Sequence, residues 1–61
     1  MRYVRNERTG VWHLLGSRGC GVDPRGEAYG EVREGSWAEV RDTVDRDEEG
    51  GRCSRCRWPP R

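Results

Sequence analysis

The chain has 61 residues, of which 38% are charged and 31% hydrophobic, and its formal net charge is +1. That length suffices for one domain and excludes a large core, because a chain this short buries only roughly 60% of the surface exposed when it is unfolded. Three Trp and two Tyr argue against full disorder. We therefore expect a single domain over residues 1–61 that depends on a covalent or metal cross-link.

The expected location follows from two features that the sequence lacks. No stretch approaches the about 20 apolar residues needed to span a membrane. The residues after Met1 contain no apolar segment typical of a signal peptide. We expect a cytoplasmic protein, or one packaged in a virus particle assembled there, in which cysteines act as metal ligands before they form disulfides.

The first predicted element is a β-hairpin. Residues 3–5 and 11–15 are β-prone, and residues 6–10 between them end in a glycine suited to a turn. In the second strand, alternation places Val11, His13 and Leu15 on one face and Trp12 and Leu14 on the other. This pattern predicts that His13 points toward the core.

A third strand and a short helix are expected next. Residues 27–33 are interpreted as the third strand. Ser36 and Glu39 match a capping box, and Trp37, Val40 and Val44 recur at helical spacing, which predicts a helix over residues 37–44. A strand is the competing interpretation there, since β-branched residues are frequent. Residues 45–51 are expected to form an acidic loop, and residues 58–61 an extended tail.

One histidine and three cysteines provide one complete ligand set for zinc. Cys53 and Cys56 have the CxxC spacing at which two thiolates can bind one tetrahedral ion, and Cys20 and His13 supply two further ligands. A thioredoxin-like redox pair, a disulfide with one remaining thiol, and an iron–sulfur centre are the alternatives. We predict one structural Zn²⁺ bound by His13, Cys20, Cys53 and Cys56.

Four protein ligands would leave no coordination position for water or substrate, and no second histidine is present to act as a general base. The sequence therefore predicts a protein that is not an enzyme and that has no small-molecule substrate.

Charge is distributed unevenly along the chain. Residues 1–25 contain five Arg and two acids, residues 26–50 three Arg and nine acids, and residues 51–61 four Arg and no acid. Because the zinc site would join the first and last segments, their arginines would form one basic face for nucleic-acid phosphates. The alternative is that arginines near the site neutralise a zinc–thiolate centre. The candidate binding residues are Arg18, Arg52, Arg55, Arg57, Trp58 and Arg61.

The segment around His13, the Cys20-Gly21 pair and the closing CxxC together resemble small single-zinc, zinc-ribbon-like proteins of GC-rich prokaryotes and their viruses. The resemblance implies a small β-rich, zinc-stabilised domain with a role in nucleic-acid or protein interaction. Our first hypothesis is a binding module acting on nucleic acid or a nucleic-acid-associated machine. The second is a structural subunit of a virion or ribosome-like particle, docked through its tail and terminal strand. A thiol redox protein is the third.

Overall fold

The computed structural model describes residues 1–16, 21–56 and 58, which form a four-stranded mixed sheet and one short helix. The elements are β1 (Arg2–Arg5), β2 (Val11–Leu14), β3 (Arg33–Glu34), α1 (Trp37–Arg46) and β4 (Gly51–Arg52). The strands lie side by side in the order β3-β1-β2-β4. The prediction of a small β-rich domain with one short helix is confirmed.

The N-terminal hairpin forms where the sequence predicts it. β1 pairs antiparallel with β2, and Tyr3 lies opposite Leu14. In the turn, the Asn6 side chain accepts hydrogen bonds from the backbone N–H groups of Arg8 and Thr9, at 2.9 and 3.2 Å. Such an Asx turn satisfies backbone donors that a tight connection would otherwise leave unpaired.

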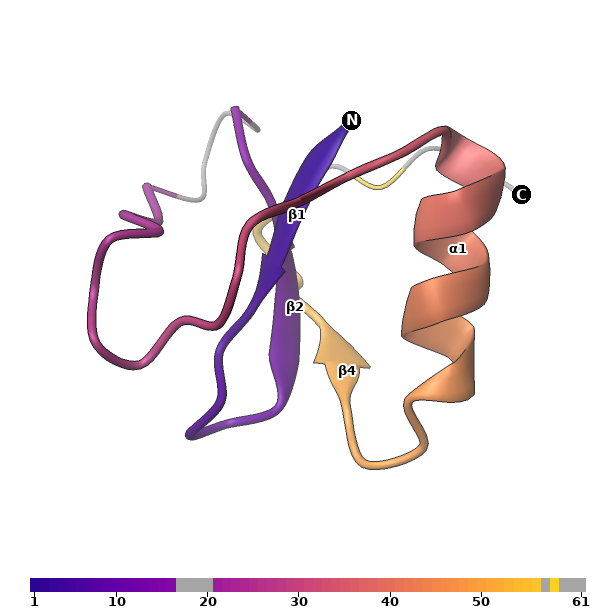
Figure 1. Ribbon diagram of the computed structural model, residues 1–61. Coiled ribbons are helices and arrows are strands. Elements are labelled where there is room, and N and C mark those ends of the chain that lie inside the picture. The colour runs from indigo at the N-terminus through magenta and orange to yellow at the C-terminus, as the bar shows by residue number, and fades with distance from the viewer. Residues whose placement is uncertain (17–20, 57, 59–61) are drawn as a thin grey trace.

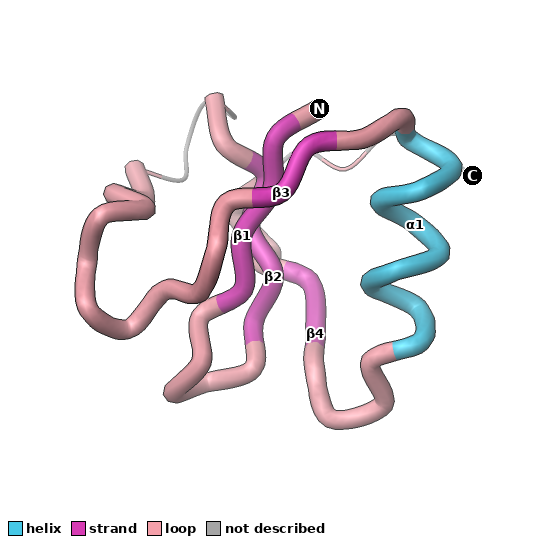
Figure 2. Tube along the Cα trace, viewed as in Figure 1, coloured by secondary structure: helices cyan, strands magenta, loops and turns pink. Residues whose placement is uncertain are grey.

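The main core lies between one face of this sheet and α1. Figures 1 and 2 show α1 on one side of the strands and the β2–β3 connection on the other. Trp12 and Leu14 of β2 are buried, as are Val40 and Val44 of α1. The Tyr3 side chain joins them, and its hydroxyl lies 3.3 Å from Oγ1 of Thr43 on the helix. The apolar contacts of these buried side chains of β2 and α1 hold the helix against the sheet.

The predicted orientation of β2 is wrong. Trp12 and Leu14 face the main core, whereas Val11 and His13 on the opposite face are only partly buried. Both faces of this strand carry apolar residues, so alternation alone does not identify the one that the helix covers. His13 therefore lies on the sheet face opposite α1.

The predicted helix is confirmed and extends two residues beyond the expected end. Ser36 is the N-cap, and its hydroxyl accepts a hydrogen bond from the Glu39 N–H at 3.3 Å. The helix continues to Arg46, so the first residues of the expected acidic loop are helical. Helical structure prevails because Val40 and Val44 occupy one face and pack on the sheet.

The third strand is shorter and later than predicted. Only Arg33–Glu34 pairs with β1, while the earlier part of the expected strand contributes a single bridge from Tyr29 to Asn6. Residues 21–30 instead form a loop of turns. Gly26 and Gly30 lie within that stretch, and glycine weakens a strand interior.

β4 is not predicted from the sequence. It pairs in parallel with β2, and Trp12 lies opposite Arg52. The Gly51 N–H donates to the carbonyl of Gly10 at 3.1 Å. Gly10 has φ +77°, and a Cβ on Gly50 would lie 2.8 Å from the Gly10 oxygen, so the two backbones approach closely only because both residues lack a side chain.

Asp47, directly after α1, ties the end of the helix to the hairpin. Its Oδ2 accepts hydrogen bonds from Nε1 of Trp12 at 2.9 Å and from Nε of Arg5 at 2.7 Å. The hydrogen bond from Trp12, followed by that from Arg5, lowers the pKa of Asp47 below its ordinary value. Because Trp12 belongs to β2, this carboxylate fixes the far end of the helix relative to the strand that carries His13.

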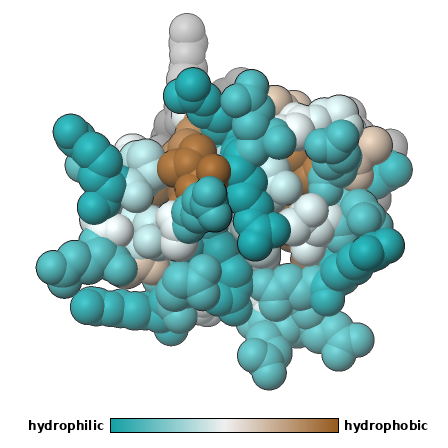
Figure 3. All heavy atoms as spheres, in the orientation of Figure 1, coloured by the Kyte–Doolittle hydropathy of each residue, from teal (hydrophilic) through white to brown (hydrophobic). Residues whose placement is uncertain are grey.

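Figure 3 shows a face dominated by hydrophilic residues. Within the described residues, no helix combines the length and the hydrophobicity needed to cross a bilayer.

Candidate metal centre

Three of the four predicted ligands meet in space. The ligand atoms of His13, Cys53 and Cys56 all lie within 4.8 Å of one another. His13 is on β2, whereas the two cysteines follow β4, so the parallel pairing of these strands brings together residues that are 40 positions apart. These three side chains lie close enough to hold a metal ion.

The backbone of the CxxC turn, residues 53–56, is fixed by hydrogen bonds to β2. The Cys53 N–H donates to the Trp12 carbonyl at 2.9 Å, which extends the β2–β4 pairing by one residue. The Cys56 N–H donates back to the Cys53 carbonyl at 3.3 Å and closes the turn.

The sulfur of Cys56 also forms a hydrogen bond to β2. Sγ of Cys56 accepts a hydrogen bond from the backbone N–H of Leu14 at 3.4 Å. Both cysteines are buried, at 8% and 5% exposure for Cys53 and Cys56. The hydrogen bond from Leu14 fixes the position of the Cys56 sulfur relative to β2.

His13 is held from the other side by the β2–β3 connection. Its ring and that of Tyr29 are arranged edge to face, with centroids 5.8 Å apart and an angle of 81°. Burial lowers the pKa of His13 below its ordinary value, because desolvation disfavours the imidazolium. The neutral ring that results is the form in which histidine ligates metals.

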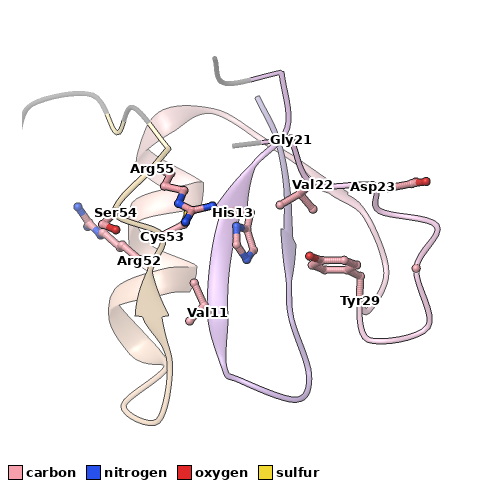
Figure 4. Close-up of a pocket in the computed structure, with 11 residues that line it drawn as sticks. Val11, His13, Gly21, Val22, Asp23, Tyr29, Arg52, Cys53, Ser54 and Arg55 are labelled. Atoms are coloured by element: carbon pink, nitrogen blue, oxygen red, sulfur yellow. The ribbon is translucent and has the colours of Figure 1, made fainter. Parts of the chain in front are cut away.

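A cleft of about 710 Å³ opens beside His13 and Cys53. Figure 4 shows His13 between the CxxC turn and Tyr29, with Arg55 on the His13 side of that turn. The tyrosine, histidine and cysteine come from three different segments, so the cleft forms only in the folded chain.

We predict that acid releases the metal. Metal binding needs deprotonated sulfur and a neutral imidazole, so protons compete with the ion for the same ligand atoms as the pH is lowered from 7.5 to 5. The lowered pKa of His13 means that its stabilising contribution is complete above its ordinary value of 6.5 and is lost as the pH falls through the folded-state value. Metal retained per chain, measured by elemental analysis after dialysis at each pH, should fall steeply over this range. Undiminished metal content at pH 5 would contradict this ligand set.

Of the other predicted site residues, the structure describes Arg52, Arg55 and Trp58. Cys20, Arg18, Arg57 and Arg61 lie outside the described residues. Arg55 is exposed beside the metal-ligand group and lines the cleft.

Arg52 and Trp58 participate in contacts within the chain. The Arg52 guanidinium is paired with Asp45 at 2.9 Å and lies over the rings of Trp37 and Trp58, 5.8 and 5.3 Å from their centroids. The two indoles are themselves 6.1 Å apart. We call Trp37, Arg52 and Trp58 the aromatic cluster. Trp58, predicted to belong to a tail that reaches a partner, packs against Trp37 of α1 and stays partly exposed.

Tyr29 is a site residue that sequence reasoning missed. Its only signal is an aromatic side chain within a turn-rich stretch, and a strand interpretation directed attention elsewhere. A Cβ on Gly26 would lie 3.2 Å from the Tyr29 ring, so the ring occupies space that this glycine leaves open. The turn formed by residues 23–26 thus positions the ring beside His13.

The donor set fits a tetrahedral thiolate–imidazole site. Bond lengths of about 2.3 Å to sulfur and 2.0–2.1 Å to nitrogen place such ligands roughly 3.5–3.8 Å apart, which a group confined within 4.8 Å can reach with little movement. Sulfur and imidazole donors do not suit Mg²⁺ or Ca²⁺, which prefer oxygen.

Comparison of the chain with protein-family models, with curated proteins and with solved structures finds no match. The resemblance to zinc-ribbon-like proteins therefore stays a prediction from the ligand pattern.

Proposed function

We propose that this chain is a non-enzymatic binding module stabilised by one structural Zn²⁺, and that it contacts nucleic acid through arginines near the metal site. The observation that supports it best is the convergence of His13, Cys53 and Cys56 within 4.8 Å. Cys20 would be the fourth ligand. When bound, the ion would supply cross-linking between the N-terminal hairpin and the C-terminal segment.

Zinc is preferred because of the type and burial of the donors. One imidazole with thiolates is typical of structural zinc sites, whereas iron–sulfur clusters are held mainly by cysteines alone. Cys53 and Cys56 are largely shielded from solvent, as expected for a site that does no chemistry on a substrate.

The nucleic-acid part of the proposal rests on where the arginines lie. Pairing of β4 with β2 brings Arg52, and the CxxC turn that carries Arg55, beside the N-terminal hairpin. Arg55 lines the cleft next to the metal-ligand group and is exposed. An exposed guanidinium on a rigid turn is suited to a phosphate contact.

Native mass spectrometry of the protein isolated gently from its own source tests both parts together. We expect one zinc per chain and co-purified nucleic acid. One zinc with a stoichiometric protein partner and no nucleic acid would instead favour the structural-subunit hypothesis.

Binding to a mixed-sequence single-stranded oligonucleotide, followed by fluorescence anisotropy, tests the arginine contact. We expect affinity to fall steeply between about 50 and 200 mM salt, because phosphate contacts release counterions. Arg55→Ala should weaken binding and reduce the slope of log K against log salt by about 1. Arg41→Ala, an exposed arginine on α1 in the acidic part of the chain, is the matched control and should change neither quantity. Equal effects of the two variants would count against an arginine face at the metal site.

A further inference from the structure

We propose that Trp58 is a positioning residue for the metal centre, so that metal binding and docking of Trp58 onto α1 are coupled. This inference depends on the proposed metal site and adds a residue that is not a ligand. It is carried by the hydrogen bond from Nε1 of Trp58 to the carbonyl of Cys53, at 3.0 Å.

The backbone carbonyl of Cys53 connects the CxxC turn with Trp58. It accepts the N–H of Cys56, which closes the CxxC turn, and also the indole N–H of Trp58. The Cys53 N–H is meanwhile fixed to the Trp12 carbonyl at 2.9 Å. The backbone N–H of Cys53 is thus held by β2 and its carbonyl by Trp58. Together these two hydrogen bonds set the direction in which the Cys53 side chain leaves the backbone.

The indole of Trp58 is itself held by the helix side of the molecule. Its ring packs on Trp37, the first residue of α1, and lies under the Arg52 guanidinium. Arg52 in turn pairs with Asp45 near the end of the same helix. The aromatic cluster therefore links the CxxC turn to both ends of α1.

Coupling between two such sites is reciprocal. If the docked indole favours the turn geometry that binds metal, then bound metal must favour docking of the indole by the same factor. Groups that hold ligands in place from one layer outside the coordination sphere typically change metal affinity by about 10- to 100-fold when they are removed.

Cobalt(II) is a suitable probe, because thiolate-to-cobalt absorption reports ligand binding directly. Trp58→Ala is expected to lower cobalt affinity by about 10- to 100-fold. Trp58→Phe keeps an aromatic ring but removes the N–H donor and the second ring of the indole, so its loss should be smaller than that of Trp58→Ala but measurable. Thr43→Ala is the control, because it removes the contact between α1 and the Tyr3 hydroxyl and alters neither the aromatic cluster nor the CxxC turn.

The control separates positioning from a general loss of stability. Compared at an equal loss of thermal stability, Trp58→Ala must weaken cobalt binding more than Thr43→Ala does. A second readout uses 5-fluorotryptophan in the unsubstituted chain. The fluorine resonances of Trp58 and Trp37 should shift with the same midpoint as the cobalt absorption.

Two results would overturn the inference. Cobalt affinity in Trp58→Ala within about twofold of the parent chain would refute a positioning role while leaving the metal site intact. So would a Trp58 resonance that does not respond to cobalt. Absence of cobalt binding by the unsubstituted chain would refute the proposed metal centre itself, so the two failures are distinguishable.

Discussion

Chelation of the metal is expected to unfold the chain cooperatively. Structural zinc in small finger peptides contributes about 10–16 kcal/mol of apparent binding free energy at neutral pH. Most domains have only about 5–15 kcal/mol of net stability, and this core is small: among the described residues, six hydrophobic side chains are buried besides the two cysteines. Without the ion, the contacts between α1 and the sheet should not hold the fold, so circular dichroism and the dispersion of amide resonances should collapse together during titration with a chelator.

Two controls make the chelation result specific. The same chelator saturated with zinc beforehand should have no effect, and addition of zinc to the unfolded chain should restore the native spectrum. Native-like circular dichroism after complete metal removal would show that the hairpin and helix are stable alone, and that the centre is not the main source of stability.

Replacement of individual ligands is expected to have the second-largest effect. Cys53→Ser and Cys56→Ser should each lower metal affinity by more than about 100-fold, since removal of groups one layer outside a site already costs about 10- to 100-fold. Ser54 lies in the same turn and its side chain is exposed, so Ser54→Ala should leave metal affinity unchanged. Competition against a chromophoric zinc indicator measures all of these variants on one scale.

Cys20 is the decisive member of that series. If it is the fourth ligand, Cys20→Ser should match the loss seen with Cys53→Ser. A change of less than about threefold would leave three protein ligands, and a zinc with three protein ligands keeps an open position that can bind water. The proposal of a purely structural site would then have to be abandoned.

The parts of the fold that the sequence predicts correctly are those determined by local chemistry. The capping box at Ser36 and Glu39 identifies the start of α1, and the glycine after a β-prone run locates the hairpin turn. The CxxC spacing and the single histidine indicate three side chains that the structure brings together. Each of these predictions depends either on residues a few positions apart in the sequence or on the number of possible metal ligands in the chain.

The features that were mispredicted or missed depend on contacts between distant segments. Parallel pairing of β4 with β2 has no local signal, because two residues are too few to show alternation. The face of β2 that is covered by α1 was misassigned for a related reason, since the covering element comes more than twenty residues later. The pairing of Arg52 with Asp45 and the docking of Trp58 were equally hidden, because charge and aromatic content do not reveal which partners the fold supplies.

The parallel pairing of β2 with β4 has a consequence for synthesis. His13 is translated 40 residues before Cys53, which at about 5–20 residues per second is an interval of roughly 2–8 s. During that time the nascent chain contains only a two-stranded hairpin and then a helix, and an isolated hairpin is at best marginally stable in water. The last ligands to leave the ribosome are also those that close the fold. We therefore expect this domain to remain open until Cys53 and Cys56 have emerged, and its yield in the cell to depend on the supply of free zinc at that moment.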